Sequence, residues 1–311
     1  MKSTTSIRLL KWVALVFGSL VVLMAIVLTL VYLITNKRMN QSFSVVSHPV
    51  AAPADSAALA YGKRLSQMRG CTDCHGENLA GRLMIDAPLV AKLYASNLTP
   101  GKGGIGKKYS DADWERSIRH AVAPDGKPLI FMPAQEFFYL SDGDLSALIS
   151  YLKSLPPEDN ELPASSIGPL ARILFLAGQM PLVPAELIDN QAAHPDAPTP
   201  GVTVEYGRYL TLGCIGCHKP DFSGGPIPGA PPDWPPASNL TPSGNLKHWS
   251  ESDFIQAMRT GIKPDGQPFS PQMPYQALNA MTDTELKAVW RFLQSLPSPS
   301  GAANGKLSLE Q

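Results

Sequence analysis

All four cysteines of this 311-residue chain lie in two copies of one five-residue pattern, Cys71-Thr-Asp-Cys74-His75 and Cys214-Ile-Gly-Cys217-His218. The pattern C-x-x-C-H is the attachment signature of c-type haem, whose vinyl groups react with the two thiols. The adjacent histidine then reaches the iron as a proximal ligand. We therefore expect two covalently bound haem c groups, with His75 and His218 on the irons. Because a haem supplies a large apolar core, the chain around each one can form a small domain.

Three other uses of paired cysteines fit the residues less well. A thioredoxin-like motif would lie between a strand and a helix of an α/β pattern, which we do not find. A zinc site would need two closely placed pairs, whereas these pairs lie far apart in the chain. A disulfide suits an exported protein. However, a bridge across two residues is strained, and it would leave both following histidines unexplained.

The composition gives no sign of nucleic-acid binding, since the formal net charge is +0. The 30 prolines predict long loops that wrap around something rather than long regular elements.

No charge occurs from Trp12 to Ile34, a stretch longer than the ~20 residues that span a bilayer. We expect an uncleaved, single-pass anchor rather than a cleaved signal peptide, whose apolar region is normally shorter. The flanking basic residues favour a cytoplasmic N-terminus, which leaves the rest of the chain in the periplasm of a bacterium.

The remainder of the chain contains one unit twice, and its short motifs recur in the same order. Tyr61-Gly and Tyr206-Gly precede the two haem motifs, and Ser154-Leu-Pro and Ser295-Leu-Pro close the two units. Between them the equivalent pairs are Asn97-Leu-Thr-Pro and Asn239-Leu-Thr-Pro, Tyr109-Ser and Trp249-Ser, Pro124-Asp-Gly and Pro264-Asp-Gly, and Met132-Pro and Met273-Pro. Two similar tandem domains follow from this repetition.

Helices account for each repeat, and the fold class we predict is all-α. Ser110 with Asp113 and Ser250 with Asp253 have capping-box spacing, and the pattern recurs from Ser141 and Thr282. Apolar residues behind the later caps follow helical spacing, and prolines end those helices. A further helix is expected before each haem motif, over 57–69 and 204–212. No convincing alternating strand pattern occurs in either unit.

Repetition also selects the second axial ligand of each iron, for which methionine, histidine or no ligand are the options. Met132 and Met273 each begin a Met-Pro pair at the same place in their unit. A thioether favours ferrous iron and raises the reduction potential, and the proline stiffens the loop through its fixed φ. A methionine often only fills a gap in a core, but no other Met or His recurs in this way. Bis-histidine ligation is therefore the minor alternative.

Other repeated polar and aromatic residues are candidates for the haem environment. Asn97 and Asn239 either bond to the haem or its ligand loop, or hold an Asx turn before the proline. Aromatic and guanidinium groups suit buried propionates. The candidates of this second kind are Tyr109, Trp249, Arg119 and Arg259.

Taken together, these motifs resemble bacterial membrane-associated multihaem cytochromes c. The similarity is to the cytochrome c subunits of periplasmic alcohol, aldehyde, gluconate and related dehydrogenases. It implies class I cytochrome c domains with His/Met ligation. It also implies redox partners of four kinds, namely a dehydrogenase, another cytochrome, a quinol-linked complex or a terminal oxidase. The chain departs from the pattern by carrying two haem motifs where three are typical, and by the retained N-terminal helix.

We therefore predict a membrane anchor followed by two haem domains. The predicted segments are the anchor over 1–40, the domains over 55–157 and 203–297, a connecting segment over 158–202 and a flexible tail over 298–311. Residues 167–183 are mostly apolar but broken by glycine and proline. This stretch either packs against a haem domain or between the two, or forms a membrane-surface or partner-binding helix.

The predicted function is one-electron transfer without chemistry on a substrate, in the bacterial inner membrane with both haem domains in the periplasm. A dihaem peroxidase, the alternative enzyme, would need an iron that peroxide can reach, whereas both repeats keep their Met-Pro pair. A haem-based sensor would also need an open iron, and normally an attached signalling domain.

Overall fold

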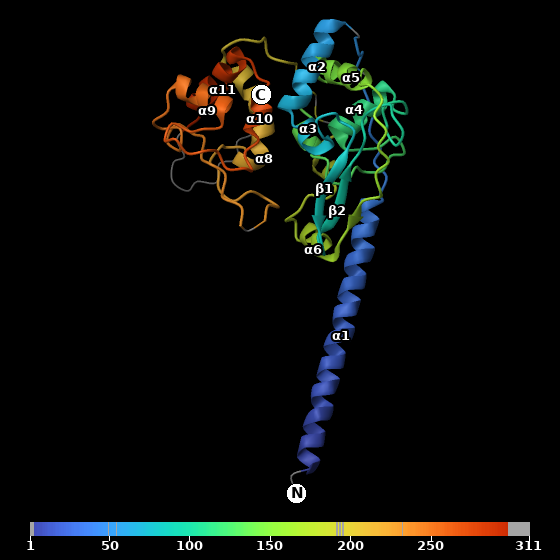
Figure 1. Ribbon diagram of the computed structural model, residues 1–311. Coiled ribbons are helices and arrows are strands. Elements are labelled where there is room, and N and C mark those ends of the chain that lie inside the picture. The colour runs from blue at the N-terminus through green and yellow to red at the C-terminus, as the bar shows by residue number, and fades with distance from the viewer. Residues whose placement is uncertain are drawn as a thin grey trace.

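The computed structural model describes residues 3–297 except 49, 54, 191, 193, 195 and 232, so the predicted tail over 298–311 lies outside the described residues. A long N-terminal helix leads to two mostly helical bodies that lie side by side (Figure 1). We call residues 55–157 the first unit and residues 203–297 the second unit.

The elements before the second unit are α1 (Ser3–Met39), α2 (Ser56–Met68), α3 (Cys71–His75), β1 (Arg82–Ala87), β2 (Ala91–Ala95), α4 (Asp111–His120), η1 (Ala134–Glu136), α5 (Asp142–Lys153), β3 (Ser166–Ile167), α6 (Pro169–Leu176) and η2 (Pro184–Leu187). Those of the second unit are α7 (Val204–Leu210), η3 (Thr211–Cys214), α8 (Ile215–His218), α9 (Glu251–Thr260), α10 (Tyr275–Leu278) and α11 (Asp283–Ser295). The η elements are short 3₁₀ helices. The helices predicted from capping and periodicity are therefore present, most with ends shifted by one to three residues.

The first and last helices of each unit cross at a glycine. A Cβ on Gly62 of α2 would lie 2.0 Å from the carbonyl oxygen of Ala147 on α5. A Cβ on Gly207 of α7 would lie 2.0 Å from that of Ala288 on α11. Both crossings therefore bring backbone against backbone, and only glycine fits. The two units are built on the same helix pair.

Three of the four predicted capping boxes form completely. In each, a hydroxyl accepts from the backbone three residues on, and the acid there accepts from the cap; the pairs are Ser110 with Asp113, Ser250 with Asp253 and Thr282 with Glu285. At the start of α5 only half of the box forms, because Ser141 accepts from the backbone of Asp144 but the carboxylate does not return the bond. That carboxylate instead accepts from the hydroxyls of Tyr61 (2.8 Å) and Tyr209 (2.6 Å).

The prediction of an all-α chain was incomplete, because β1 and β2 of the first unit form a small antiparallel sheet with β3 of the connecting segment, in the order β1-β2-β3. The turn between β1 and β2 holds Leu89 at φ 69°, a position that normally selects glycine or asparagine. The hairpin therefore lacks the usual turn residues, and five-residue β2 is too short for its alternation to stand out. Among the described residues, the equivalent part of the second unit has only an isolated bridge between Gly225 and Ala237.

Helix α1 is long and apolar enough to cross a membrane, over Ile7–Met39. Its C-terminal end is joined to the connecting segment. Arg172 of α6 donates to Thr35 (2.6 Å) and Asn36 (2.8 Å), and Arg38 pairs with Glu186 of η2. Helix α6 thus packs against α1 (Figure 1), and the chain just after it, at Gln179 and Pro181, lies close to Gly229 of the second unit.

Buried apolar side chains form three clusters. One lies within the second unit and includes Leu210, Phe254 and Leu293. Another lies within the first unit and includes Trp114 and Leu148. The third joins the α4–α5 region of the first unit to the connecting segment. Its buried members are Ala121, Val122, Ala134, Ala171, Phe175, Leu182, Val183 and Ala185. Among the described residues, the first unit is therefore wrapped by flanking chain that has no counterpart around the second.

The two units meet through an approximately two-fold set of bonds. Asp144 and Glu285 are equivalent acids, and each accepts from a tyrosine of its own unit, Tyr61 and Tyr206 respectively. Each also accepts from the other unit, because Tyr209 reaches Asp144 and Arg64 forms an ion pair with Glu285. Burial, helped by the charge of Asp144, raises the pKa of Tyr209 to about 12, so its hydroxyl remains a donor.

Candidate functional site

Each C-x-x-C-H motif lies on one short helical turn that follows the first helix of its unit. The first motif forms α3, and the second runs from the end of η3 through α8. All four cysteines are free thiols, so neither pair is closed as a disulfide. Burial raises the pKa of Cys71 to about 12 and that of Cys214 to about 11, which keeps these thiols protonated.

The two motif histidines make the same hydrogen bond. Nδ1 of His75 lies 2.7 Å from the carbonyl oxygen of Ser96, and Nδ1 of His218 lies 2.8 Å from that of Ser238. A carbonyl can only accept, so Nδ1 carries the proton and Nε2 keeps its lone pair. A bond from the other ring nitrogen to a backbone carbonyl is the usual way in which a metal-binding histidine is oriented. Sequence reasoning missed Ser96 and Ser238, although each directly precedes the repeated Asn-Leu-Thr-Pro.

The Met-Pro pairs of the two units, which begin at Met132 and Met273, have the same backbone geometry. A third pair, Met180-Pro181, lies in the connecting segment. Pro133 has φ −79° and ψ 58°, and Pro274 has φ −80° and ψ 56°. In each, the amide two residues after the methionine donates to the methionine carbonyl at 2.8 Å. These values define an inverse γ-turn centred on the proline. Both Met side chains are half-buried against the cluster that also borders the first cysteine of their own unit, Met132 with Cys71 and Met273 with Cys214.

Asn97 and Asn239 form the Asx turns that were weighed against a haem-binding role. Oδ1 of each accepts from the backbone two residues on, at Thr99 and Thr241, both at 2.9 Å. Nδ2 of buried Asn97 also donates to the carbonyl of Glu158 at 2.8 Å, which fastens the segment after α5. These bonds hold the loops whose preceding carbonyls meet the motif histidines.

Arg119 and Arg259 connect the third helix of each unit to the start of the last one. Nη2 of Arg119 donates to the carbonyl of Leu140 (2.6 Å) and to Asp142 (2.7 Å). Nη2 of Arg259 makes the same bonds to Met281 (2.7 Å) and Asp283 (2.8 Å). The guanidinium groups predicted as propionate partners are therefore used to join helices.

The aromatic candidates border the apolar clusters, Tyr109 in the first unit and Trp249 in the second. Tyr109 lies edge-on to Trp114, with ring centroids 5.2 Å apart. Nε1 of Trp114 is buried and has no hydrogen-bond partner within the described part of the chain. A buried N–H of this kind suits an anionic acceptor beside the cluster. Trp114 was not singled out from the sequence because Phe254 stands at its place in the second unit.

One carboxylate, that of Glu136, lies between the two haem motifs. A Cβ on Gly216, inside the second motif, would lie 2.5 Å from Oε1 of Glu136, which comes from the turn after Met132-Pro133. The charge of Glu136 also acts on the pKa of Cys74 in the first motif, behind the larger effect of burial. Burial raises the pKa of Glu136 to about 7, although Arg69 opposes the shift. Glu136 and Arg69 have no equivalent in the second unit, so comparison of the two repeats does not mark them.

Comparison with known proteins matches both units to one family. A family model described as cytochrome c matches residues 59–156 and 204–297, which together are more than half of the chain. Each matched region contains one C-x-x-C-H motif and one Met-Pro pair.

Several relatives have similar sequences. The chain is 29% identical to the cytochrome c subunit of a quinone alcohol dehydrogenase of Gluconacetobacter polyoxogenes, covering 78% of this chain and 57% of the relative. It is 30% identical to the gluconate 2-dehydrogenase cytochrome c subunit of Pantoea cypripedii, covering 78% and 60%. It is 27% identical to the fructose dehydrogenase cytochrome subunit of Gluconobacter japonicus, covering 81% and 55%. The chain thus spans a little over half the length of these relatives.

Proposed function

The chain belongs to the cytochrome c family, and on that premise we propose that it is a membrane-anchored dihaem carrier of single electrons. The observation that carries the proposal is the pair of matching ligand arrangements. In both units a backbone carbonyl fixes the motif histidine with Nε2 free, and a proline γ-turn presents a methionine from the same apolar cluster. His75 with Met132 and His218 with Met273 would hold two haem irons, which would supply one-electron chemistry without a position for a substrate.

We propose class I cytochrome c domains over 55–157 and 203–297. Cys71, Cys74, Cys214 and Cys217 would attach the two haem c groups, and His75, Met132, His218 and Met273 would ligate the irons. When bound, these groups would supply the one-electron chemistry. The protein would orient the ligands and exclude water from the apolar clusters. The free N–H of Trp114 supports a role as a propionate donor in the first unit.

We further propose that electrons pass between the two haems, and the positions of the motifs support this. Glu136, beside the Met132 turn, touches the second motif and acts on the pKa of a cysteine of the first. The attachment sites would therefore face each other across the contact between units, which favours rapid transfer from one iron to the other.

We propose that α1 is kept as a single-pass anchor in the bacterial inner membrane, with both units in the periplasm. The support is that Thr35, Asn36 and Arg38, at the end of α1, bond to the connecting segment. Leu170, Ile173 and Leu176 are exposed on neighbouring α6, which suits the membrane surface beside the anchor. N-terminal sequencing of the membrane-bound protein should begin before Trp12. A start after Ile34 would mean that the helix is a cleaved signal.

The relatives are subunits of dehydrogenases by name, and we propose a dehydrogenase as the electron donor. The acceptor would be another cytochrome, a quinol-linked complex or a terminal oxidase.

Haem counting and carbon monoxide binding test the electron-carrier function. A pyridine haemochrome assay should give two covalent haems per chain. Dithionite should reduce both reversibly, and the reduced protein should not bind carbon monoxide because both axial positions are filled. Stoichiometric carbon monoxide binding would instead indicate an open iron, as in a peroxidase or a sensor.

A further inference from the structure

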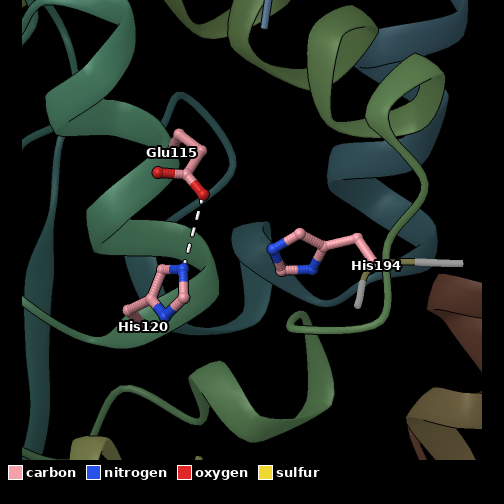
Figure 2. A group of neighbouring side chains, drawn as sticks. All are labelled: Glu115, His120 and His194. Carbon is pink, nitrogen blue, oxygen red and sulfur yellow. Dashed lines mark ion pairs between the residues drawn. The ribbon is translucent and has the colours of Figure 1, made fainter. Parts of the chain in front are cut away.

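A compact group of possible metal ligands lies in the first unit, at the end of α4. Glu115 and His120 project from this helix, and His194 approaches from the connecting segment (Figure 2). One ligand atom from each residue lies within 4.8 Å of the others. Oε1 of Glu115 and Nε2 of His120 are 3.4 Å apart. Two ligands on a tetrahedral zinc ion are about 3.3 Å apart, given bonds of ~2.0–2.1 Å.

Two of the atoms that face the centre of this group are buried without a hydrogen-bond partner among the described residues. Glu115 is 0% exposed and His120 is 2% exposed, yet Oε1 and Nε2 lack a hydrogen-bond partner among the described residues. A buried, unsatisfied carboxylate oxygen costs free energy unless something compensates it. The nearest cation, Nη1 of Arg119, is 3.8 Å from Oε1. Arg119 also pairs with Asp142, so these three groups together leave one negative charge.

The outward-facing atom of each ligand, by contrast, is held by another group. Nδ1 of His120 lies 2.6 Å from Oδ1 of Asn190, and Nδ1 of His194 lies 3.0 Å from the carbonyl of Phe138. Ser47 donates to Oε2 of Glu115 at 2.6 Å. Such outer bonds set both imidazoles with Nε2 unprotonated, as in protein metal sites.

The second unit indicates that the fold does not need these residues. Ile255 stands at the place of Glu115 and Thr260 at the place of His120, in the otherwise matching helix α9. Ile255 is half-buried and Thr260 is exposed. In the first unit the partners come from chain outside the repeat, Ser47 before it and Asn190 and His194 after it.

We propose that Glu115, His120 and His194 bind a divalent transition-metal ion of the zinc class. Two imidazoles and one carboxylate are a common zinc ligand set, with water able to fill a fourth position. Because His194 belongs to the connecting segment, the ion would tie that segment to α4. The site is separate from both haem motifs and does not depend on the electron-transfer proposal.

Zinc stoichiometry tests the site directly. The tag-free, haem-loaded full chain in detergent is stripped with a chelator, dialysed against zinc chloride near pH 7.5, and measured for zinc and iron by mass spectrometry. We expect one zinc ion for every two irons. His194→Ala and Glu115→Gln should each lose this zinc while keeping the haem spectrum. Asn190→Ala should weaken binding by ~10–100-fold, as loss of an outer partner does.

His248→Ala is the matched control, because His248 is an exposed histidine of the second unit. It should keep one zinc ion per chain. Limited proteolysis measures whether the ion holds the connecting segment to α4. Zinc should slow cleavage between residues 188 and 202 in the wild type but not in His194→Ala. The proposal is overturned if the wild type takes up no stoichiometric zinc, or if His194→Ala retains it.

Discussion

The two units share their haem-facing geometry but differ in what surrounds it. Both have the histidine–carbonyl bond, the Met-Pro γ-turn, the glycine crossing and the arginine that joins two helices. Within the part of the chain that the structure describes, only the first contributes to a sheet, borders a further apolar cluster and is wrapped by chain from before and after it. Features that we propose to serve the haem therefore follow the repeat. Among the described residues, the apolar cluster shared with the end of α1 and with the connecting segment belongs to the first copy.

The largest expected effect comes from removing one attachment motif. Replacing both cysteines of a motif with alanine, Cys71 and Cys74 or Cys214 and Cys217, should lower the haemochrome count from two to one. The second unit should lose more helix by circular dichroism when its motif is removed, because it has no additional cluster to replace the haem core. Two haems in either variant would contradict the assignment of the motifs.

Arg119 and Arg259 make equivalent bonds, so they test how burial changes the contribution of those bonds to the free energy of unfolding. Arg119 is fully buried, whereas the side chain of Arg259 is 31% exposed. Arg119→Ala leaves Glu115 without its nearest cation and should cost about 3–5 kcal/mol of unfolding free energy. Arg259→Ala should cost about 1 kcal/mol. Denaturant unfolding of both variants measures the two losses of unfolding free energy. Equal losses would mean that the chain around the first unit does not change the contribution of its arginine.

The glycine crossings should instead behave alike in the two units. Gly62→Ala and Gly207→Ala each push a Cβ against a backbone carbonyl and should each cost about 3 kcal/mol. Gly143→Ala, where the nearest atom is 4.0 Å away, is the control and should be neutral or slightly stabilising. Thermal unfolding measures all three. A loss of stability in only one of the two glycine variants would show that the two helix pairs are not equivalent.

The smallest effect concerns pH and Glu136. Its folded-state pKa of about 7 lies above the ordinary value of ~4.3, because burial disfavours the charged form. As pH rises, the unfolded chain therefore loses this proton first. The associated stability is present below about pH 4 and is lost by about pH 7. Glu136→Gln should remove this part of the pH dependence in denaturant unfolding. An unchanged pH profile would show that Glu136 does not titrate in this range.

Much of the helical frame could be predicted from the sequence, because caps and apolar spacing are local signals. The motif histidines and the Met-Pro pairs could also be predicted, because they belong to short local motifs that recur in both repeats. The sheet could not be foreseen, since its turn has Leu89 where glycine is expected. Ser96 and Ser238 act through backbone carbonyls, which carry no residue signature. Glu136, His194 and Asn190 acquire partners only through tertiary packing, so no pattern in the chain marks them.

The central claim is that both irons have the same two axial ligands. The oxidised protein should show the sulfur-to-iron charge-transfer band of methionine ligation. Met132→Ala and Met273→Ala should each remove about half of it and open one haem to carbon monoxide in the reduced state. Met180→Ala, a methionine of the connecting segment, serves as the control and should leave the band unchanged. A band that survives both ligand substitutions in full would contradict the account.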